Sequence, residues 1–231
     1  LQVPVEDLEA YPREWDTEPY LGGSYLPHPR PRAAYAAMIT HLDREVGALL
    51  DRLEKLGLAE NTIVMFSSDN GTTWAGGVDY EFFDSTGELS GLKGSVLEGG
   101  LRVPFLVRWP GKVAAGSESD FPSYFPDVFP TVLDLAGLAD DRPHDGHSLL
   151  PIFHGGSFDR TKPLYWEHGD QQALRLGDWK LVRRRLGKKN PATKLFNLKE
   201  DPGEKQDLAS TEPERLQELL EVSRKSRFPS K

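Results

Sequence analysis

The sequence predicts an α/β protein that ends in a small antiparallel sheet and a helix. Residues 31–57 place apolar side chains every three or four positions, and residues 62–67 form a continuous apolar run with β-branched members. Residues 158–198 alternate short strand-like pieces with Gly-Asp and Gly-Lys turns. A helix followed by an apolar strand is typical of an α/β layer, whereas short strands joined by turns favour an antiparallel sheet. We therefore expect an α/β part over residues 1–157 and an antiparallel part with a terminal helix over residues 158–231.

The first 32 residues are rich in proline and aromatic side chains. Proline fixes φ and lacks a backbone donor, so this segment is predicted to be irregular. We expect it to lie against a neighbouring surface.

A long amphipathic helix is predicted to follow. Pro31 suits the first turn of a helix, and Gly57 suits the position after its end. Its apolar stripe consists of Ala34, Met38, Leu42, Val46, Leu49, Leu53 and Leu56. The apolar run at residues 62–67 comes after a short turn, and we expect it to be a buried strand of a parallel sheet.

The later elements are predicted from similar patterns. Residues 72–100 are rich in glycine and lack periodicity, which indicates a long loop; inside a compact domain such a loop is usually functional. We expect strands at residues 103–109, 164–167, 173–176, 179–184 and 194–198, and helices at residues 130–136 and 212–225.

Composition excludes several classes of protein. The chain has 231 residues, a hydrophobic fraction of 38%, a charged fraction of 28% and a formal net charge of −8. This acidic balance argues against a general nucleic-acid-binding protein, which needs a basic surface. The absence of cysteine excludes disulfides and cysteine-ligated zinc. No apolar run reaches the ~18 residues of a membrane-spanning helix, so we expect no membrane span.

Asp69 and Asn70 are candidate metal ligands. They follow the apolar run directly, and ligands of open α/β sheets bind beyond the carboxyl ends of strands. Carboxylate and amide oxygens suit Ca²⁺ or Mg²⁺, although Ca²⁺ takes about six to eight ligands. The same Asp-Asn-Gly string also suits a plain turn. From the residues alone, both interpretations stay open.

Lys93 lies between glycines in the long loop, where its ammonium group could neutralise an oxygen of sulfate or phosphate. A solvated loop lysine is the alternative. His168, beside Glu167, is a further candidate for facing a substrate. His144 and His147 are three residues apart but have no third partner nearby in the sequence, so we do not expect a metal site there.

One basic run, residues 183–189, is interpreted as the solvated tip of a hairpin. The alternative is contact with a polyanion such as a sulfated polysaccharide, by charge attraction.

Taken together and in order, the motifs resemble the sulfatases of the alkaline phosphatase superfamily. The similarity extends from about residue 34 to residue 208. The matching motifs are Asp43, Ser68–Gly71, Gly91–Gly100, Arg102–Pro104, Arg108–Gly111, Asp127–Asp134, Asp145–Pro151, Trp179–Val182, Leu195–Leu198 and Asp201–Glu204.

The resemblance implies a fold and residue roles. The fold would be a partial alkaline-phosphatase-like sheet with flanking helices, followed by the small antiparallel sheet and helix. Asp69 and Asn70 would be Ca²⁺ ligands, and Lys93 would contact the sulfate group of a sulfated small molecule or polysaccharide. The helix with Asp43, the Glu98-Gly-Gly turn and residues 145–151 would be structural. In the family, the hydrate of a formylglycine made from Cys or Ser attacks sulfur and the alcohol leaves.

The chain departs from the family pattern at the nucleophile. It contains no Cys and no Ser-x-Pro-x-Arg string; the nearest match, at residues 211–215, begins with Thr. The family's early Asp-Asp pair, its first lysine and its His-x-Pro element are absent as well. We therefore expect a truncated, C-terminal portion of a sulfatase that is inactive alone and holds an incomplete metal shell.

Two alternatives remain open. One is a phosphonate or phosphodiester hydrolase of the same superfamily. The other is a non-catalytic module that binds an anion or a partner, and an exposed sheet edge would allow self-association. The chain itself does not specify a compartment, whereas the resemblance implies a periplasmic or extracellular location for the complete protein.

Overall fold

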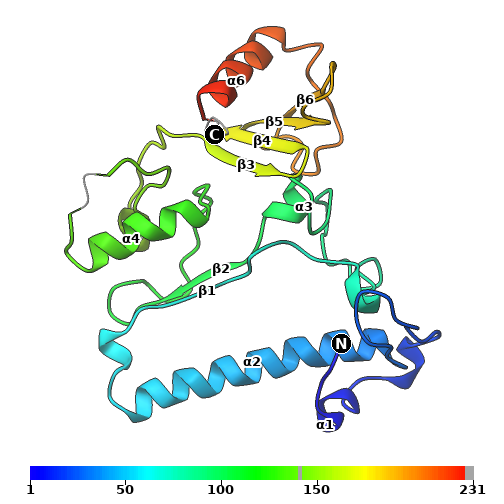
Figure 1. Cartoon of the computed structure of the whole chain (residues 1–231). Coiled ribbons are helices and arrows are strands. Elements are labelled where there is room, and N and C mark those ends of the chain that lie inside the picture. Colours follow the sequence, from blue (N-terminus) through cyan, green and yellow to red (C-terminus); the bar gives the residue numbers. More distant parts are fainter. Residues whose placement is uncertain (140–141, 227–231) are drawn as a thin grey trace.

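A computed structural model of the chain describes residues 1–139 and 142–226. Figure 1 shows a long helix on one side, a two-stranded ribbon next to it, and a four-stranded sheet with its own helix at the far end. The described helices are α1 (Val5–Leu8), α2 (Pro31–Lys55), α3 (Glu98–Leu101), α4 (Val128–Leu135), α5 (Leu150–Phe153) and α6 (Pro213–Ser226). The strands are β1 (Val64–Ser67), β2 (Phe105–Arg108), β3 (Leu164–His168), β4 (Gln171–Leu176), β5 (Trp179–Arg184) and β6 (Ala192–Asn197). Short 3₁₀ turns lie at η1 (Arg13–Trp15), η2 (Ala59–Asn61), η3 (Ala75–Gly77) and η4 (Phe125–Asp127).

The proline-rich lead-in lies against a neighbouring surface as expected, but α2, which follows it in the sequence, provides this surface. The buried carboxylate of Asp7 accepts hydrogen bonds from both guanidinium nitrogens of Arg44 and lies 2.9 Å from His41 Nδ1. These contacts fasten α1 to α2. The hydrogen bonds from Arg44 hold the pKa of Asp7 at about 2, below its ordinary value, although burial opposes this shift.

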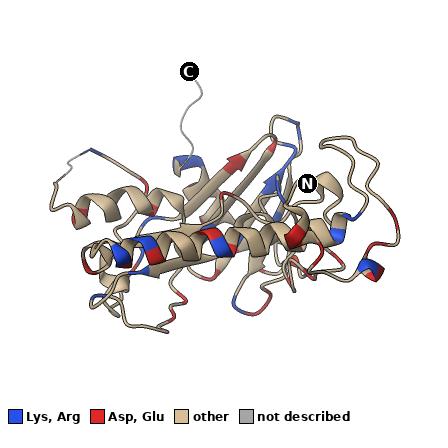
Figure 2. Cartoon of the chain, turned by 90° about the horizontal axis from the view of Figure 1, so that it is seen from below, with Lys and Arg blue, Asp and Glu red and all other residues tan. Residues whose placement is uncertain are grey.

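The predicted long helix is confirmed as α2, but most of its apolar stripe is not covered by the described residues. Ala33, Ala34 and Ala37 are buried, whereas Met38 and Leu49 are 38% and 56% exposed. In Figure 2, blue and red segments along α2 mark its Lys or Arg and its Asp or Glu residues. Amphipathic spacing determines which residues share a face, but it does not specify what covers that face. None of the described helices is long and apolar enough to cross a membrane.

The expectation of a buried parallel strand at residues 62–67 is wrong in direction and in burial. β1 pairs antiparallel with β2, with Val64 opposite Arg108 and Ser67 opposite Phe105, and every residue of β1 is only partly buried. An apolar run with β-branched residues indicates a strand, but strand direction depends on the connection and the pairing partner.

Beyond β1, the Asp69-Asn70-Gly71 turn is seated on α3. The backbone N–H of Gly71 donates to the Gly100 carbonyl at 3.0 Å. A Cβ atom at Gly71 would lie 1.9 Å from the Gly99 carbonyl oxygen, so only glycine permits this approach. The Glu98-Gly-Gly turn therefore provides the surface on which the turn after β1 rests.

The segment around α4 is organised by a buried carboxylate. Asp127 is fully buried, accepts hydrogen bonds from the backbone N–H groups of Tyr124 and His147, and pairs with Arg160. These contacts connect the start of α4 to the segment before α5.

The predicted C-terminal antiparallel sheet and helix are confirmed. The four strands pair in the order β3-β4-β5-β6, each antiparallel to its neighbour. One face packs against α6 through a cluster of Leu174, Leu181, Leu195 and Leu219. The other face packs Ala173, Val182, Phe196 and Leu198 against Val96, which lies next to α3. Because both faces are covered, the strands are apolar on both sides rather than strictly alternating.

A buried charge cluster connects α3 to this sheet. Lys180 on β5 is fully buried, and its Nζ lies 2.7 Å from Glu98 Oε1 and 2.9 Å from Glu204 Oε1. Glu204 Oε2 accepts a 2.6 Å hydrogen bond from the backbone N–H of Glu98. Burial opposes ionisation of Glu98, but Lys180 outweighs it and holds the pKa of Glu98 below its ordinary value. Burial prevails at Glu204 and raises its pKa.

Replacing Lys180 by methionine is expected to destabilise the fold by roughly 3–5 kcal/mol, because Glu98 and Glu204 would be left buried without their cation. The carboxyl pKa values would then rise, so the loss should be smaller at pH 5 than at pH 8. Urea unfolding of the Lys180→Met variant at both pH values measures this. The control is Lys194→Met, at an exposed position of the neighbouring strand, which should change little. Equal losses of unfolding free energy in the two variants, or a loss that does not depend on pH, would contradict the stabilising role of Lys180 in the buried charge cluster.

Replacing Gly71 by alanine is expected to cost about 1–3 kcal/mol, because the new Cβ overlaps backbone atoms of α3 that cannot rotate away. Gly47→Ala is the matched control, since Gly47 is inside α2 and a Cβ atom added there would have no neighbouring atom within 4 Å; it should stabilise by about 0.5–1 kcal/mol. Thermal unfolding compares the two. If Gly71→Ala left the unfolding temperature unchanged, the turn would not rest on α3.

Candidate functional site

The candidate metal ligands lie at the open end of β1. Asp69 is exposed and Asn70 is partly buried, directly after the strand ends at Ser67. The Asn70 amide nitrogen donates to the Gly71 carbonyl at 3.1 Å. The amide oxygen is not used in this bond and could coordinate a cation. The turn interpretation and the ligand interpretation are thus compatible: the string forms a turn, and the turn presents two oxygen-bearing side chains.

The glycine-rich loop brings Lys93 to the same place. The backbone N–H of Lys93 donates to the Thr72 carbonyl at 2.7 Å, and the N–H of Gly99 donates to the Ser90 carbonyl at 2.7 Å. Gly91 and Gly94 adopt positive φ, which lets the loop fold back over residues 71–72. Asp69, Asn70 and Lys93 consequently line one cavity of about 840 Å³.

Strand β3 forms another wall of this cavity, including His168. A Cβ atom at Gly94 would lie 3.8 Å from His168 Nε2, so the imidazole faces the turn that carries Lys93. Gln171, at the start of β4, donates to the Gly94 carbonyl at 3.0 Å. The four-stranded sheet thus both lines the cavity and holds the lysine loop.

Several cavity residues were not predicted from the sequence. They are Ser24, Tyr25, Thr73, Trp74, Ala75, Tyr165, Trp166 and Glu167, together with backbone around α3. They come from the lead-in, the loop after β1 and strand β3, which are far apart in the sequence. Only one sequence pattern indicated this part of the cavity, namely His168 beside Glu167, which was a candidate for facing a substrate.

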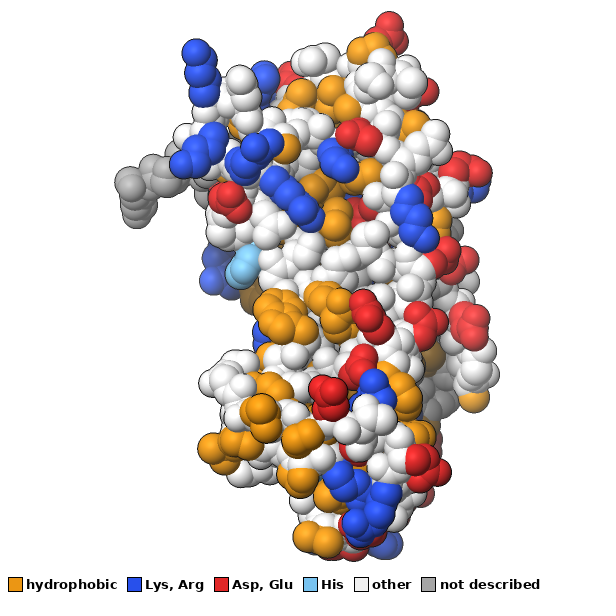
Figure 3. Space-filling view, turned by 90° about the vertical axis from the view of Figure 1, so that its right-hand side faces the viewer, with side chains coloured by type: hydrophobic (Ala, Val, Ile, Leu, Met, Phe, Trp, Pro, Cys, Tyr) orange, Lys and Arg blue, Asp and Glu red, His pale blue; other side chains and the backbone are white. Residues whose placement is uncertain are grey.

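The other sequence candidates lie away from this cavity. Lys162 Nζ donates to the carbonyls of His144 and Gly146, at 2.5 and 3.2 Å. Burial, with the nearby cations Arg160 and Lys162, lowers the pKa of His147. The basic run lies at the turn between β5 and β6, as predicted, and Figure 3 shows Lys and Arg side chains gathered over this part of the molecule.

The cavity brings together oxygen-bearing side chains and a lysine. Asp69 and Asn70 supply two hard oxygen ligands, and Lys93 supplies a positive charge on the neighbouring loop. Over residues 1–139 and 142–226, no group of three or more His, Cys, Asp or Glu side chains is arranged to hold a metal ion.

Comparison with known proteins identifies the family that the chain resembles. The family described as Sulfatase matches residues 4–138, and the family described as N-sulphoglucosamine sulphohydrolase, C-terminal, matches residues 92–225. Steryl-sulfatase of Rattus norvegicus is 44% identical over 126 residues, which are 53% of this chain and 22% of that protein. N-acetylgalactosamine-6-sulfatase of Canis lupus familiaris is 36% identical over 167 residues, which are 71% of this chain and 30% of that protein.

A solved structure extends the similarity to nearly the whole chain. The crystal structure of Ps i-CgsB in complex with k-i-k-neocarrahexaose superposes with a TM-score of 0.76 at 29% identity, covering 99% of this chain and 48% of that one. The chain thus spans about half of this structural relative, and less of the two curated proteins. The matched families together extend from residue 4 to residue 225. The chain belongs to the sulfatase family.

Proposed function

We propose that the protein to which this chain belongs hydrolyses sulfate monoesters. In this proposal Asp69 and Asn70 are ligands of a divalent cation, and Lys93 contacts the sulfate group that is transferred. One observation carries it: Asp69, Asn70 and Lys93, from two separate motifs of a sulfatase-family chain, line one cavity.

Lys93 acts through its charge. The distribution of negative charge over the sulfate oxygens shifts as the sulfur–oxygen bond to the alcohol breaks. A preorganised ammonium group stabilises the negative charge on these oxygens in the transition state. The backbone bond from Lys93 to Thr72 and the Gln171 contact at Gly94 fix the backbone on both sides of this side chain. His168 lines the same cavity and is proposed to face the alcohol part of the substrate.

The cation is proposed to be Ca²⁺. Asp69 and Asn70 offer the carboxylate and amide oxygens that Ca²⁺ prefers, and a bound cation would neutralise sulfate oxygens as a Lewis acid. The remaining ligands of a shell of about six to eight would come from residues other than those described.

The nucleophile is proposed to be a formylglycine supplied by residues that this chain does not contain, since it has no Cys and no Ser-x-Pro-x-Arg string. The 231-residue chain alone is therefore expected to lack turnover. We also propose that the chain divides into an α/β part, residues 1–157, and a C-terminal part, residues 158–231.

The substrate is proposed to be a sulfated small molecule or polysaccharide. Contact between residues 183–189 and a polyanion stays a prediction, as do self-association through the sheet edge and a periplasmic or extracellular location.

The Lys93→Met variant of the complete protein is expected to lose about 10²–10³-fold in kcat/KM for a sulfate monoester, because a preorganised charge at the transferred group is removed. Steady-state kinetics with 4-nitrophenyl sulfate, 4-nitrophenyl phosphate and a phenylphosphonate ester measure this loss and the preferred ester. The control Lys112→Met changes an exposed lysine in the turn after β2 and should keep wild-type activity.

Three results would overturn parts of this proposal. Higher kcat/KM for the phosphate or phosphonate ester would favour the phosphonate or phosphodiester hydrolase. Turnover by the 231-residue chain alone would contradict an external nucleophile. Absence of turnover of every ester by the complete protein would favour a non-catalytic anion-binding or partner-binding module.

A further inference from the structure

We propose that Trp74 and Tyr25 form an aromatic platform that binds the ring of a sulfated pyranoside, next to the sulfate-contacting Lys93. This inference rests on the proposed function, and it specifies the class of alcohol that carries the sulfate group. The sequence patterns did not indicate either aromatic residue, since both lie outside the matching family motifs.

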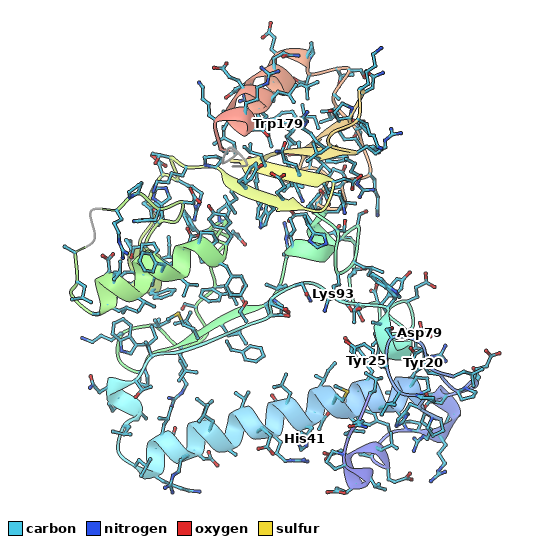
Figure 4. The ribbon with its side chains drawn as sticks, viewed as in Figure 1. Tyr20, Tyr25, His41, Asp79, Lys93 and Trp179 are labelled. Atoms are coloured by element: carbon cyan, nitrogen blue, oxygen red, sulfur yellow. The ribbon has the colours of Figure 1, made fainter. Side chains whose placement is uncertain are left out.

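Both rings are exposed on the cavity wall. Trp74 is 59% exposed and Tyr25 is 53% exposed, and both line the cavity that contains Asp69, Asn70 and Lys93. Large aromatic side chains left open to solvent in a concave site are typical of a ligand-binding surface. Figure 4 shows Tyr25, from the lead-in, lying close to the loop that carries Lys93.

Two glycine contacts hold the platform in place. Tyr20 and His28 exchange two backbone hydrogen bonds of 2.9 Å, which closes the loop that presents Tyr25. Cβ atoms at Gly76 and Gly77 would lie 3.0 Å from the Tyr25 ring and 2.7 Å from Tyr20 Cβ. The lead-in loop therefore packs closely on η3, the turn that follows Trp74.

The platform is also tied to the sulfate side of the cavity. Lys93 donates its backbone N–H to Thr72, two residues before Trp74. Thr73 Oγ1 accepts a 3.0 Å hydrogen bond from the backbone N–H of Ala75, which fixes the turn between them. The short connection from Thr72 keeps the backbone of Trp74 close to the loop that carries Lys93.

The rest of the cavity lining mixes polar groups with the apolar side chains of Val96, Leu101 and Trp166. His168 and Glu167 on β3 and Ser24 in the lead-in bring an imidazole, a carboxylate and a hydroxyl to the same cavity. A pyranose has an apolar C–H face, which suits an aromatic ring, and a rim of hydroxyl groups, which suits polar side chains. A steroid ring system offers the apolar face without this rim, so the imidazole, carboxylate and hydroxyl groups in the cavity favour the sugar.

The test uses the complete protein and three sulfate esters: N-acetylgalactosamine 6-sulfate, estrone sulfate and propyl sulfate. The Trp74→Ala variant is expected to raise KM for the sulfated sugar by about tenfold, through loss of ring contact, and to change kcat/KM for propyl sulfate by less than about twofold. Trp74→Phe keeps a ring and should recover most of the loss. Phe129→Ala, at a 46% exposed aromatic outside the cavity lining, is the control.

A second measurement does not depend on turnover or on how well Trp74→Ala folds. The protein is labelled with 5-fluorotryptophan, and Trp74→Phe assigns the Trp74 resonance by its disappearance. In ¹⁹F NMR, this resonance should shift with N-acetylgalactosamine 6-sulfate, and inorganic sulfate should leave it unchanged. The Trp179 resonance, on the α6 side of the C-terminal sheet, should stay in place with both.

The outcomes separate the two proposals. The platform is overturned if Trp74→Ala and Tyr25→Ala leave turnover of the sulfated sugar unchanged and the Trp74 resonance does not shift. The sulfatase proposal is unaffected by that result. An equal or greater loss with estrone sulfate overturns the assignment to a pyranose. No turnover of any of the three esters by the wild-type protein contradicts the proposed function and the platform together.

Discussion

The structure depends on one buried ion cluster, in which Lys180 joins Glu98 and Glu204 between the glycine-rich loop and the C-terminal sheet. Removing three charged groups from water is costly, so this cluster persists only because each carboxylate shares the same ammonium group. Val96 adds apolar contact with the same face of the sheet. The C-terminal sheet is therefore not an appendage to the cavity, since it holds the loop that forms one of its walls. In Figure 1, α3 lies between the sheet and the β1–β2 ribbon, where this connection is made.

The same arrangement explains why the glycines matter. Gly71 lets the turn after β1 approach α3 at backbone distance, and Gly99 and Gly100 let residues 90–95 of the lysine loop approach α3 in the same way. Side chains at these positions would separate walls that must adjoin if one ligand is to contact all of them. Lys93, Asp69, Asn70 and the aromatic residues Trp74 and Tyr25 therefore line one cavity because a few backbone segments are packed without side chains between them.

The sequence predicted local structure better than it predicted neighbours. Helix α2, the C-terminal strands and α6 followed from periodicity and turn residues, because those signals reside in contiguous residues. The parallel partner expected for residues 62–67 was wrong, since strand direction is a property of pairing. Ordered motifs indicated the family and the three candidate residues that converge on the cavity. Trp74 and Tyr25 were not predicted, because their shared position arises only when the lead-in folds onto η3.

The most direct measurement is amide hydrogen exchange in the Lys180→Met variant, under conditions where it remains folded. If the C-terminal sheet positions the lysine loop, the backbone amides of Lys93 and Gly99 should lose protection, because their bonds to Thr72 and Ser90 open with the loop. Amides in the middle of α2 should keep theirs. Unchanged protection at Lys93 and Gly99, or an equal loss throughout α2, would contradict a positioning role for the buried cluster.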